Sequence, residues 1–173
     1  GLGDVYKRQQ LVGVYALGKA QRVMRLLREA GWQQPFWLHG ALVPLTDLYR
    51  RLGHEFGDVR LVKESGATDL KGQIVLAPPS ALADRWSRRL PEPVHAMASG
   101  WMGIRARARQ RGVELPLVIS DHADWDELVQ TLRDVGAPRL WVTHGREEAL
   151  VHQARAMGID AQALSLVGYE EEE

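Results

Sequence analysis

Residues 117–124 read Leu-Val-Ile-Ser-Asp-His-Ala-Asp, and residues 140–145 read Leu-Trp-Val-Thr-His-Gly. In both stretches a short apolar run, typical of a buried strand, is followed by a histidine. Between them Asp124 stands three residues before Glu127, the spacing of a capping box at the start of a helix. The two stretches therefore predict a strand, a helix and a second strand, with a histidine just past the carboxyl end of each strand.

The two histidines, His122 and His144, are expected to face one crevice if the strands are parallel. A right-handed crossover tends to place such strands side by side, and adjacent strands lie ~4.8 Å apart. Open α/β sheets bind ligands at the carboxyl ends of their strands, and imidazole is both a metal ligand and an acid–base group. The alternative is a pair of unrelated loop histidines. We predict a compact βαβαβ unit over residues 113–168 with the two imidazoles side by side.

The rest of the chain continues the alternation of strands and helices, which predicts an α/β fold. Apolar spacing predicts further helices over residues 19–30, 44–52, about 80–90 and about 147–157. Short apolar runs predict further strands over residues 36–38, 59–62, 74–77, 94–97 and 161–167, and residues 100–116 are predicted to form a loop.

The composition is that of a globular protein: of 173 residues, 45% are hydrophobic and 25% are charged. The chain has no cysteine, which excludes disulfides, thiolate zinc sites and cysteine nucleophiles, so a metal site must use His, Asp and Glu. No apolar run approaches the ~20 residues that a membrane span needs, and the regions of a signal peptide are absent. We therefore expect a cytoplasmic protein without a membrane partner.

The net charge of zero hides an asymmetry along the chain. Residues 1–112 hold 18 basic and 9 acidic residues, whereas residues 113–173 hold 4 basic and 13 acidic residues. The basic region could bind a polyanion and the acidic region a cation. The alternative is a charge split that only holds the two regions together.

Two short segments are candidates for phosphate contacts. Ser99 and Gly100 follow a predicted strand and could offer hydroxyl and N–H groups to a phosphate, although an ordinary turn explains them equally well. Gly18 and Lys19 stand at a predicted helix start, whose free N–H groups can bind phosphate, although no Walker motif surrounds them.

Arginines alternate in the predicted loop at Arg105, Arg107, Arg109 and Arg111. In an extended loop they would project on one side and suit a nucleic-acid backbone. The alternative is a solvated loop. Trp101, in the same segment, could stack a base.

Two aspartates near His122 have alternative roles. Asp124 could orient a catalytic histidine through a hydrogen bond, besides its role as a helix N-cap. Asp121 could approach a metal because it adjoins His122. The remaining histidines lack metal-ligand spacing and are expected to be structural or surface residues: His39, His54, His95 and His152.

Several motifs resemble those of β-CASP metallo-β-lactamase nucleases, over roughly residues 10–168. Ser-Asp-His-Ala-Asp (120–124), followed by a helix and Val-Thr-His-Gly (142–145), is similar to the C-terminal signature of that family. Residues 97–102 (Met-Ala-Ser-Gly-Trp-Met) and 15–21 (Tyr-Ala-Leu-Gly-Lys-Ala-Gln) resemble two further segments. The sequence Ser-Gly-Trp-Met most resembles the bacterial branch of ligase-associated exonucleases, or mRNA 3′-end-processing-factor homologues.

The resemblance implies a hydrolase with two zinc ions that cuts phosphodiester bonds in DNA repair or RNA processing. On that pattern His144 ligates zinc, and His122 acts on the scissile phosphate as a general acid or a hydrogen-bond donor. The implied partners are DNA or RNA, with a DNA ligase or helicase by family association. A histidine at the position of His144 is frequent in RNA-directed members, while this branch is usually called a DNA exonuclease, so the substrate stays open.

One departure from the family is large: its His-x-His-x-Asp-His motif, which supplies most zinc ligands, does not occur in the chain. We therefore expect a fragment that holds most of the β-CASP insert (10–112) and the C-terminal half of the metallo-β-lactamase αββα fold (113–168), truncated at the N-terminus. Residues 1–9 resemble a translated adaptor sequence, and residues 169–173 form an acidic tail.

Such a fragment is expected to bind no zinc tightly, to be inactive by itself and, because of exposed strand edges, to be poorly soluble. Two other functions remain open: a non-catalytic nucleic-acid-binding module of the same fold, and an unrelated α/β phosphate-binding domain.

Overall fold

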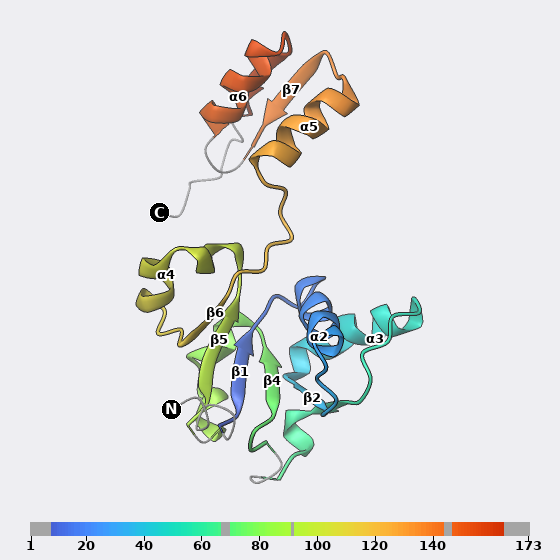
Figure 1. The fold of residues 1–173 in the computed structure, drawn as a ribbon, viewed down its shortest axis with the longest axis vertical. Helices are drawn as coiled ribbons and strands as arrows, with labels where there is room; N and C mark the ends of the chain where they lie inside the picture. Colours follow the sequence, from blue (N-terminus) through green and yellow to red (C-terminus); the bar gives the residue numbers. More distant parts are fainter. Residues whose placement is uncertain (1–7, 67–69, 91, 144–146, 165–173) are drawn as a thin grey trace. The chain divides into compact units, whose positions relative to one another are not determined.

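A computed structural model of the chain describes residues 8–66, 70–90, 92–143 and 147–164. The chain forms two compact units, Gly1–Asp121 and His122–Glu173. Strands and helices alternate in both units, as expected for an α/β protein (Figure 1). In chain order the first unit contains β1 (Gln10–Gly13), α2 (Lys19–Glu29), β2 (Phe36–Leu38), η1 (Gly40–Leu42), α3 (Val43–Arg51), β3 (Val59–Leu61), η2 (Val62–Glu64), β4 (Ile74–Ala77), η3 (Pro79–Leu82), η4 (Ser87–Arg89), β5 (Val94–Ala98), η5 (Gly100–Gly103), α4 (Arg105–Gln110) and β6 (Leu115–Leu117). The second unit contains α5 (Trp125–Val135), β7 (Arg139–Val142), α6 (Glu147–Ala156) and β8 (Asp160–Ala163).

The first unit is built on a six-stranded parallel sheet in the order β3-β2-β4-β1-β5-β6. The arrows of β1, β4 and β5 point the same way in Figure 1. Parallel strands must be joined by crossovers, and these crossovers cover both faces of the sheet. That arrangement explains why β4, Ile-Val-Leu-Ala, is buried at all four positions.

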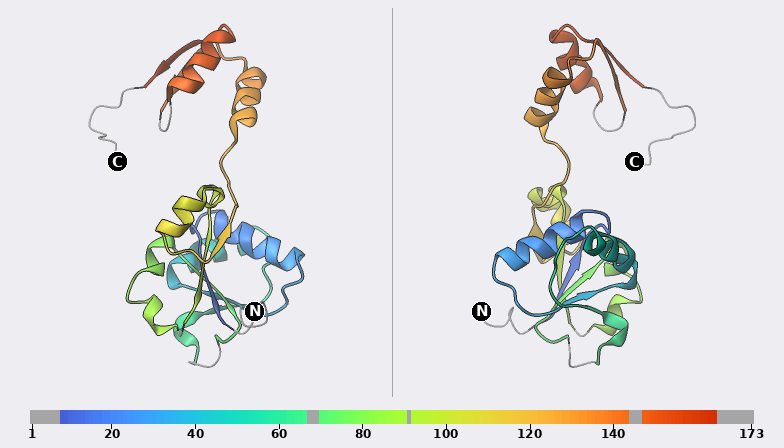
Figure 2. Two further views of the ribbon diagram at one scale, coloured as in Figure 1. Left: turned by 60° about the vertical axis from the view of Figure 1, so that its left-hand side comes forward. Right: turned by 90° about the vertical axis from the view of Figure 1, so that its right-hand side faces the viewer.

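Successive residues of each strand pack into different cores because strand side chains alternate between faces. Val12, Phe36 and Leu76 belong to the core under α2, which also contains Val23 and Met24 of that helix. A second core lies on the other face: its buried members include Leu11, Trp37, Val75, Ala81 and Leu90. The left view of Figure 2 shows α2 on one side of this sheet, with the turns η3 and η4 on the other.

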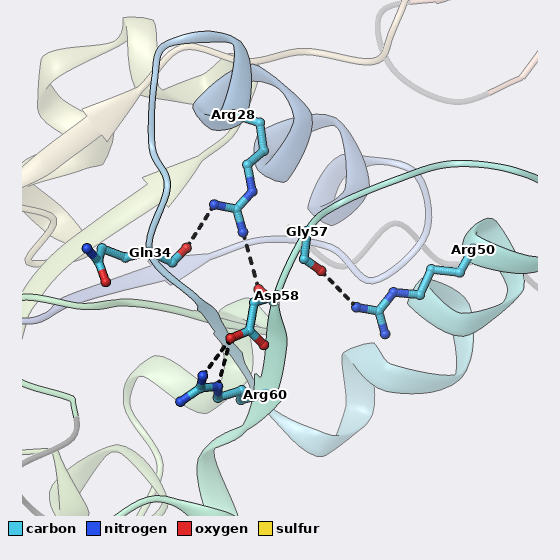
Figure 3. Close-up of polar contacts among 6 residues, drawn as sticks. All are labelled: Arg28, Gln34, Arg50, Gly57, Asp58 and Arg60. Carbon is cyan, nitrogen blue, oxygen red and sulfur yellow. Dashed lines mark hydrogen bonds and ion pairs between the residues drawn. The ribbon is translucent and has the colours of Figure 1, made fainter.

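An arginine on α2 forms hydrogen bonds with the loops that lead into β2 and β3. The guanidinium of Arg28 donates to the carbonyls of Trp32 (2.7 Å), Gln34 (2.8 Å), Phe56 (2.8 Å) and Asp58 (3.2 Å), in part visible in Figure 3. Each hydrogen bond to a charged group contributes roughly 1.5–3 kcal/mol. Burial lowers the pKa of Arg28, and the Asp58 carboxylate offsets part of that effect.

Gly57 allows this arginine to approach the chain. Its φ is +69°, and a Cβ placed there would come within 3.0 Å of the Arg28 guanidinium. The Gly57 carbonyl also accepts a hydrogen bond from Arg50 at 3.3 Å (Figure 3). A side chain at position 57 would therefore strain the backbone and displace Arg28.

The second unit is smaller, and its local structure follows the sequence closely. Asp124 accepts a hydrogen bond from the Glu127 N–H (2.9 Å), and the Glu127 carboxylate accepts from the Asp124 N–H (3.0 Å), which confirms the predicted capping box. Gly136 ends α5 with a left-handed φ of 58°. Strands β7 and β8 pair in parallel, and a compact core forms around Val142, Val151 and Ala154.

Three structural expectations were wrong. The predicted helix over about 80–90 is two 3₁₀ turns, because Asp84 bonds locally: its carboxylate accepts from the Arg85 N–H (2.6 Å) and its carbonyl accepts from the Ser87 hydroxyl (2.7 Å). The predicted loop over 100–116 contains η5, α4 and the start of β6. Arginine and alanine are good helix formers, which explains α4.

The third correction concerns the predicted βαβαβ unit over residues 113–168. Strand β6 ends at Leu117 and pairs with β5, with Ala96 opposite Leu115, so it belongs to the first sheet. The compact units divide between Asp121 and His122, nine residues after the expected boundary at 112/113. The assignment of the two parts to β-CASP and metallo-β-lactamase segments stays a prediction.

Among the described residues, none of the helices combines the length and the apolar character that crossing a lipid bilayer requires.

Candidate functional site

The topology of the first unit offers a position for a ligand between β1 and β5. The chain leaves β1 toward β2, on the β4 side of the sheet, and leaves β5 toward β6, on the opposite side. Strands β1 and β5 are neighbours, so their connections diverge at this point. Open α/β sheets bind ligands in the crevice outside the carboxyl ends of such a strand pair. The segments that reach this edge are residues 14–19 after β1 and residues 99–103 after β5.

Lys19, at the first turn of α2, is the buried charge of this edge. Its side chain is 5% exposed, and its Nζ lies 2.8 Å from Oδ1 of Asp121, whose side chain is 40% exposed. The Nζ also lies 5.4 Å from the centre of the Tyr15 ring. A buried ammonium is retained only with a partner, because an unpaired buried charge is costly. Lys19 is thus held with its positive end directed at a carboxylate that solvent can reach.

A second cation of α2 contacts the same segment. The Arg22 guanidinium donates to the Ser120 carbonyl at 2.6 Å. Lys19 and Arg22 are three residues apart on the helix and share a face. The three-residue spacing in the sequence could have indicated a shared role for the two residues. The prediction from the sequence named Lys19 alone.

Ser99 and Gly100 shape the turn after β5. The Ser99 side chain accepts a hydrogen bond from the Trp101 N–H at 3.3 Å, and its own N–H donates to the Leu117 carbonyl at 3.1 Å. Gly100 is close to Ser120: a Cβ at position 100 would lie 3.2 Å from the Ser120 Cβ and Oγ. The structure thus brings the candidate turn against the same segment that Lys19 and Arg22 hold.

The arginine segment after this turn differs from the prediction. Arg105, Arg107 and Arg109 lie on helix α4, where Arg105 and Arg109 are four residues apart and share a face while Arg107 points to roughly the opposite side, so the three do not project together. All three are exposed. Arg107 packs its guanidinium carbon 3.7 Å from the centre of the Trp101 ring. Arg111, just past the helix, has its Nη1 3.8 Å from the Met97 sulfur.

The histidine prediction concerns the second unit. His122 is exposed and is the first residue of that unit. His144 lies outside the described residues, so the expected pairing of the two imidazoles stays a prediction. Asp124 is the N-cap of α5, which is one of the two roles predicted for it. Asp121, which could approach a metal, forms an ion pair with Lys19, and its role near a metal stays a prediction.

The described residues do not bring a set of metal ligands together. Across residues 8–66, 70–90, 92–143 and 147–164, no group of three or more His, Asp or Glu side chains is placed to hold a metal ion. A catalytic zinc usually has three protein ligands. The described part of the chain therefore does not fit a complete zinc site.

His39 also stands at the carboxyl edge of the sheet, after β2, and was expected to be structural. Its Nδ1 accepts the Ala41 N–H at 3.0 Å, and its ring meets Trp86 edge-on, with the ring centres 4.6 Å apart. Burial lowers the pKa of His39, and the nearby Asp84 carboxylate partly opposes this shift. Nδ1 must be unprotonated to accept this hydrogen bond. These contacts are those of a histidine with a structural role.

No family model matches the chain. The chain is similar to a protein of Opitutus terrae named probable DNA ligase, with 29% identity over 150 residues that make up 87% of this chain. The chain spans about 14% of the length of that relative.

Proposed function

We propose that the chain is the nucleic-acid-binding part of a metal-dependent nuclease that hydrolyses phosphodiester bonds of DNA. The observation that carries the proposal is the buried Lys19, held at the carboxyl edge between β1 and β5 with its ammonium 2.8 Å from an exposed carboxylate. An ammonium in that position can bind a phosphate oxygen in place of the carboxylate oxygen. The resemblance of the Ser-Asp-His-Ala-Asp and Val-Thr-His-Gly motifs to β-CASP nucleases supports the hydrolytic part.

The surroundings of Lys19 suit a phosphate group. Ser99 and Gly100 form a turn beside Ser120, and Arg22 lies on the same face of α2 as Lys19. Residues 1–121 carry 18 basic and 11 acidic side chains, whereas residues 122–173 carry 4 basic and 11 acidic side chains. A polyanion is therefore attracted to the first unit and repelled by the second.

The catalytic part of the proposal comes from the family resemblance. Bound zinc would supply the Lewis-acid chemistry that phosphodiester hydrolysis of this class uses. In this proposal His144 would ligate zinc, and His122 would act on the scissile phosphate as a general acid or a hydrogen-bond donor. Because the described residues do not fit a complete zinc site, their proposed roles are to bind and orient the phosphate.

DNA is the favoured substrate over RNA. The relative from Opitutus terrae bears the name probable DNA ligase, and a nuclease segment next to a ligase would act on the same polymer. The alternative function is a nucleic-acid-binding module without catalysis. It would bind the phosphate in the same way but would not hydrolyse the phosphodiester bond.

The test is binding of fluorescent DNA and RNA oligonucleotides to the full chain over a range of salt concentrations. We expect DNA binding that weakens with salt, and Lys19→Met should lower the slope of log K against log salt by the value of one phosphate contact, ~0.7 for single-stranded and ~0.9 for duplex DNA. Lys71→Met is the matched control, because Lys71 is exposed and precedes β4, at the opposite edge of the sheet. Asp121→Asn should tighten binding, because a phosphate then no longer competes with a carboxylate for Lys19.

Two results would contradict the proposal. One is binding that is independent of salt. The other is an equal loss of affinity in Lys19→Met and Lys71→Met, which would mean that Lys19 acts only as part of the general charge.

A further inference from the structure

Trp101 is a large apolar side chain that the fold leaves in solvent and yet holds in place. It is 56% exposed. Its backbone is fixed by the Ser99 side chain, which accepts the Trp101 N–H, and by Ile104, whose N–H donates to the Trp101 carbonyl at 3.1 Å. Arg107 covers the indole, with its guanidinium carbon 3.7 Å from the ring centre. An exposed aromatic ring that is held in this way, with other exposed apolar side chains beside it, is available to stack against a ligand.

The neighbourhood of Trp101 combines apolar and positively charged groups. Ile104 is 47% exposed and Val118 is 65% exposed. A Cβ at Gly103 would lie 4.0 Å from Val118, so Val118 borders the turn that carries Trp101. The helix that follows presents Arg105, Arg107 and Arg109 to solvent.

This combination selects the class of ligand. An apolar protein surface would leave the three arginines of α4 without partners, and a carbohydrate would not use their charge. A nucleic acid uses both features, because its bases stack on aromatic rings while its phosphates contact arginine. Trp101 directly follows Gly100, which lies beside Ser120, and Asp121 after it pairs with Lys19, so a base on the indole would belong to a nucleotide near the phosphate proposed for Lys19.

We propose that Trp101, backed by Arg107, stacks an unpaired base, so that the first unit binds single-stranded DNA in preference to duplex DNA. The proposal rests on the nucleic-acid binding proposed above and specifies its substrate. In a duplex each base already stacks on its neighbours and its faces are closed to a side chain. Only a single strand, or the end of a frayed duplex, offers a free base face to an indole.

The second unit provides a matched control pair. Arg139 lies 5.6 Å from the ring centre of Trp141, which is 51% exposed. This pair resembles Trp101 and Arg107 in composition and exposure. It lies in a unit with an excess of acidic residues, so substitution of Trp141 should leave DNA binding unchanged.

The experiment measures the affinity of the full chain for an oligothymidylate and a duplex, each of about 12 nucleotides per strand, within the range that one binding fold covers. The proteins are the wild type, Trp101→Leu, Trp101→Phe and Trp141→Leu, each checked by circular dichroism and thermal unfolding. Trp101→Leu should weaken single-strand binding about 10-fold, the usual effect of one lost stacking contact. Trp101→Phe should retain most of the affinity because an aromatic face remains, and duplex binding should change little in either variant.

The outcomes separate the two proposals. If the wild type binds neither DNA in a salt-dependent manner, the proposed function fails and the stacking proposal fails with it. If the wild type binds DNA with the expected salt dependence but Trp101→Leu affects neither form, only the stacking proposal is overturned. The same holds if Trp101→Leu weakens both forms equally, or if Trp101→Phe is as weak as Trp101→Leu, because either result indicates a structural role.

Discussion

The two units of the chain bury their apolar side chains to different extents. In the first unit Phe36 and Leu76 are completely buried, and the sheet is covered on both faces. In the second unit Trp125, Val135 and Trp141 are 45%, 68% and 51% exposed. The difference follows from sheet size, since a sheet of two strands has only edge strands and offers little area to cover.

The comparison indicates where the stability of the chain resides. Burial contributes roughly 25 cal/mol per Å² of apolar surface, so the first unit gains most of its stability from its two cores. The second unit depends more on local devices, such as the capping box at Asp124 and the left-handed glycine at the end of α5. We expect the two units to respond differently to the same kind of substitution.

The largest contrast should come from one leucine in each unit. Leu76 is completely buried in β4, whereas Leu140 in β7 is half-buried beside the core of the second unit. Leu76→Ala should lower the free energy of unfolding of the first unit by about 2–5 kcal/mol. Leu140→Ala should cost the second unit about 1 kcal/mol, because fewer contacts are lost. Hydrogen exchange with peptide resolution, measured in increasing urea, follows each unit separately.

The wild-type exchange rates provide the reference for both substitutions. Amides of β1 and β4 should exchange more slowly than those of β7 and β8. Equal protection in the two sheets, or an equal cost of the two substitutions, would mean that the units do not differ in stability.

A smaller effect is expected from the helix cap of the second unit. Asp124→Ala removes the acceptor of the Glu127 N–H and should destabilise α5 by about 1 kcal/mol, while Asp124→Ser should restore most of the loss. The change should speed amide exchange in α5 and leave the first unit unaltered. Faster exchange in β1 or β5 would show that the cap supports more than its own helix.

The smallest effect concerns pH and the first unit. Burial lowers the pKa of His39 below its usual value of 6.5, so the unfolded chain takes up a proton at this position at a higher pH than the folded chain does. The free energy of unfolding should therefore fall as the pH drops below about 6.5. Protonation also removes the acceptor of the Ala41 N–H.

The variant His39→Asn separates this effect from that of the other histidines, because asparagine keeps an acceptor oxygen and does not titrate. The unfolding free energy of His39→Asn should decline less than that of the wild type between pH 7 and pH 5, conditions chosen around the usual histidine pKa. A nuclear magnetic resonance titration of His39 with a pKa above 6.5 would contradict the structural assignment.

Much of the local structure was readable from the sequence. Apolar spacing predicted α2 and α5 to within a residue or two, and Gly31 and Gly136 end them with positive φ angles. The exceptions have local causes. The apolar run at the start of residues 117–124 indicated a strand there, whereas β6 begins at Leu115 and ends at Leu117, and it accepts Pro116 because it is the edge strand of the sheet.

The candidate site was predictable only in part. Lys19, Ser99 and Gly100 were identified from their places at element ends, and the structure puts all three at one edge of the sheet. The roles of Arg22 and of Asp121 as partner of Lys19 were not predicted, since each contact joins segments distant in the chain.

The sequence by itself determined the α/β class, most helices and strands, and the charge difference between the two parts, because periodicity, caps and composition act over a few residues. Only the tertiary structure decided that β6 joins β5 in the first sheet, that the units divide at Asp121, and that Lys19 meets that aspartate. The physical reason is that strand pairing and buried ion pairs depend on which distant segments meet. Hydrogen bonding and burial in the folded chain set that choice, and no local pattern encodes it.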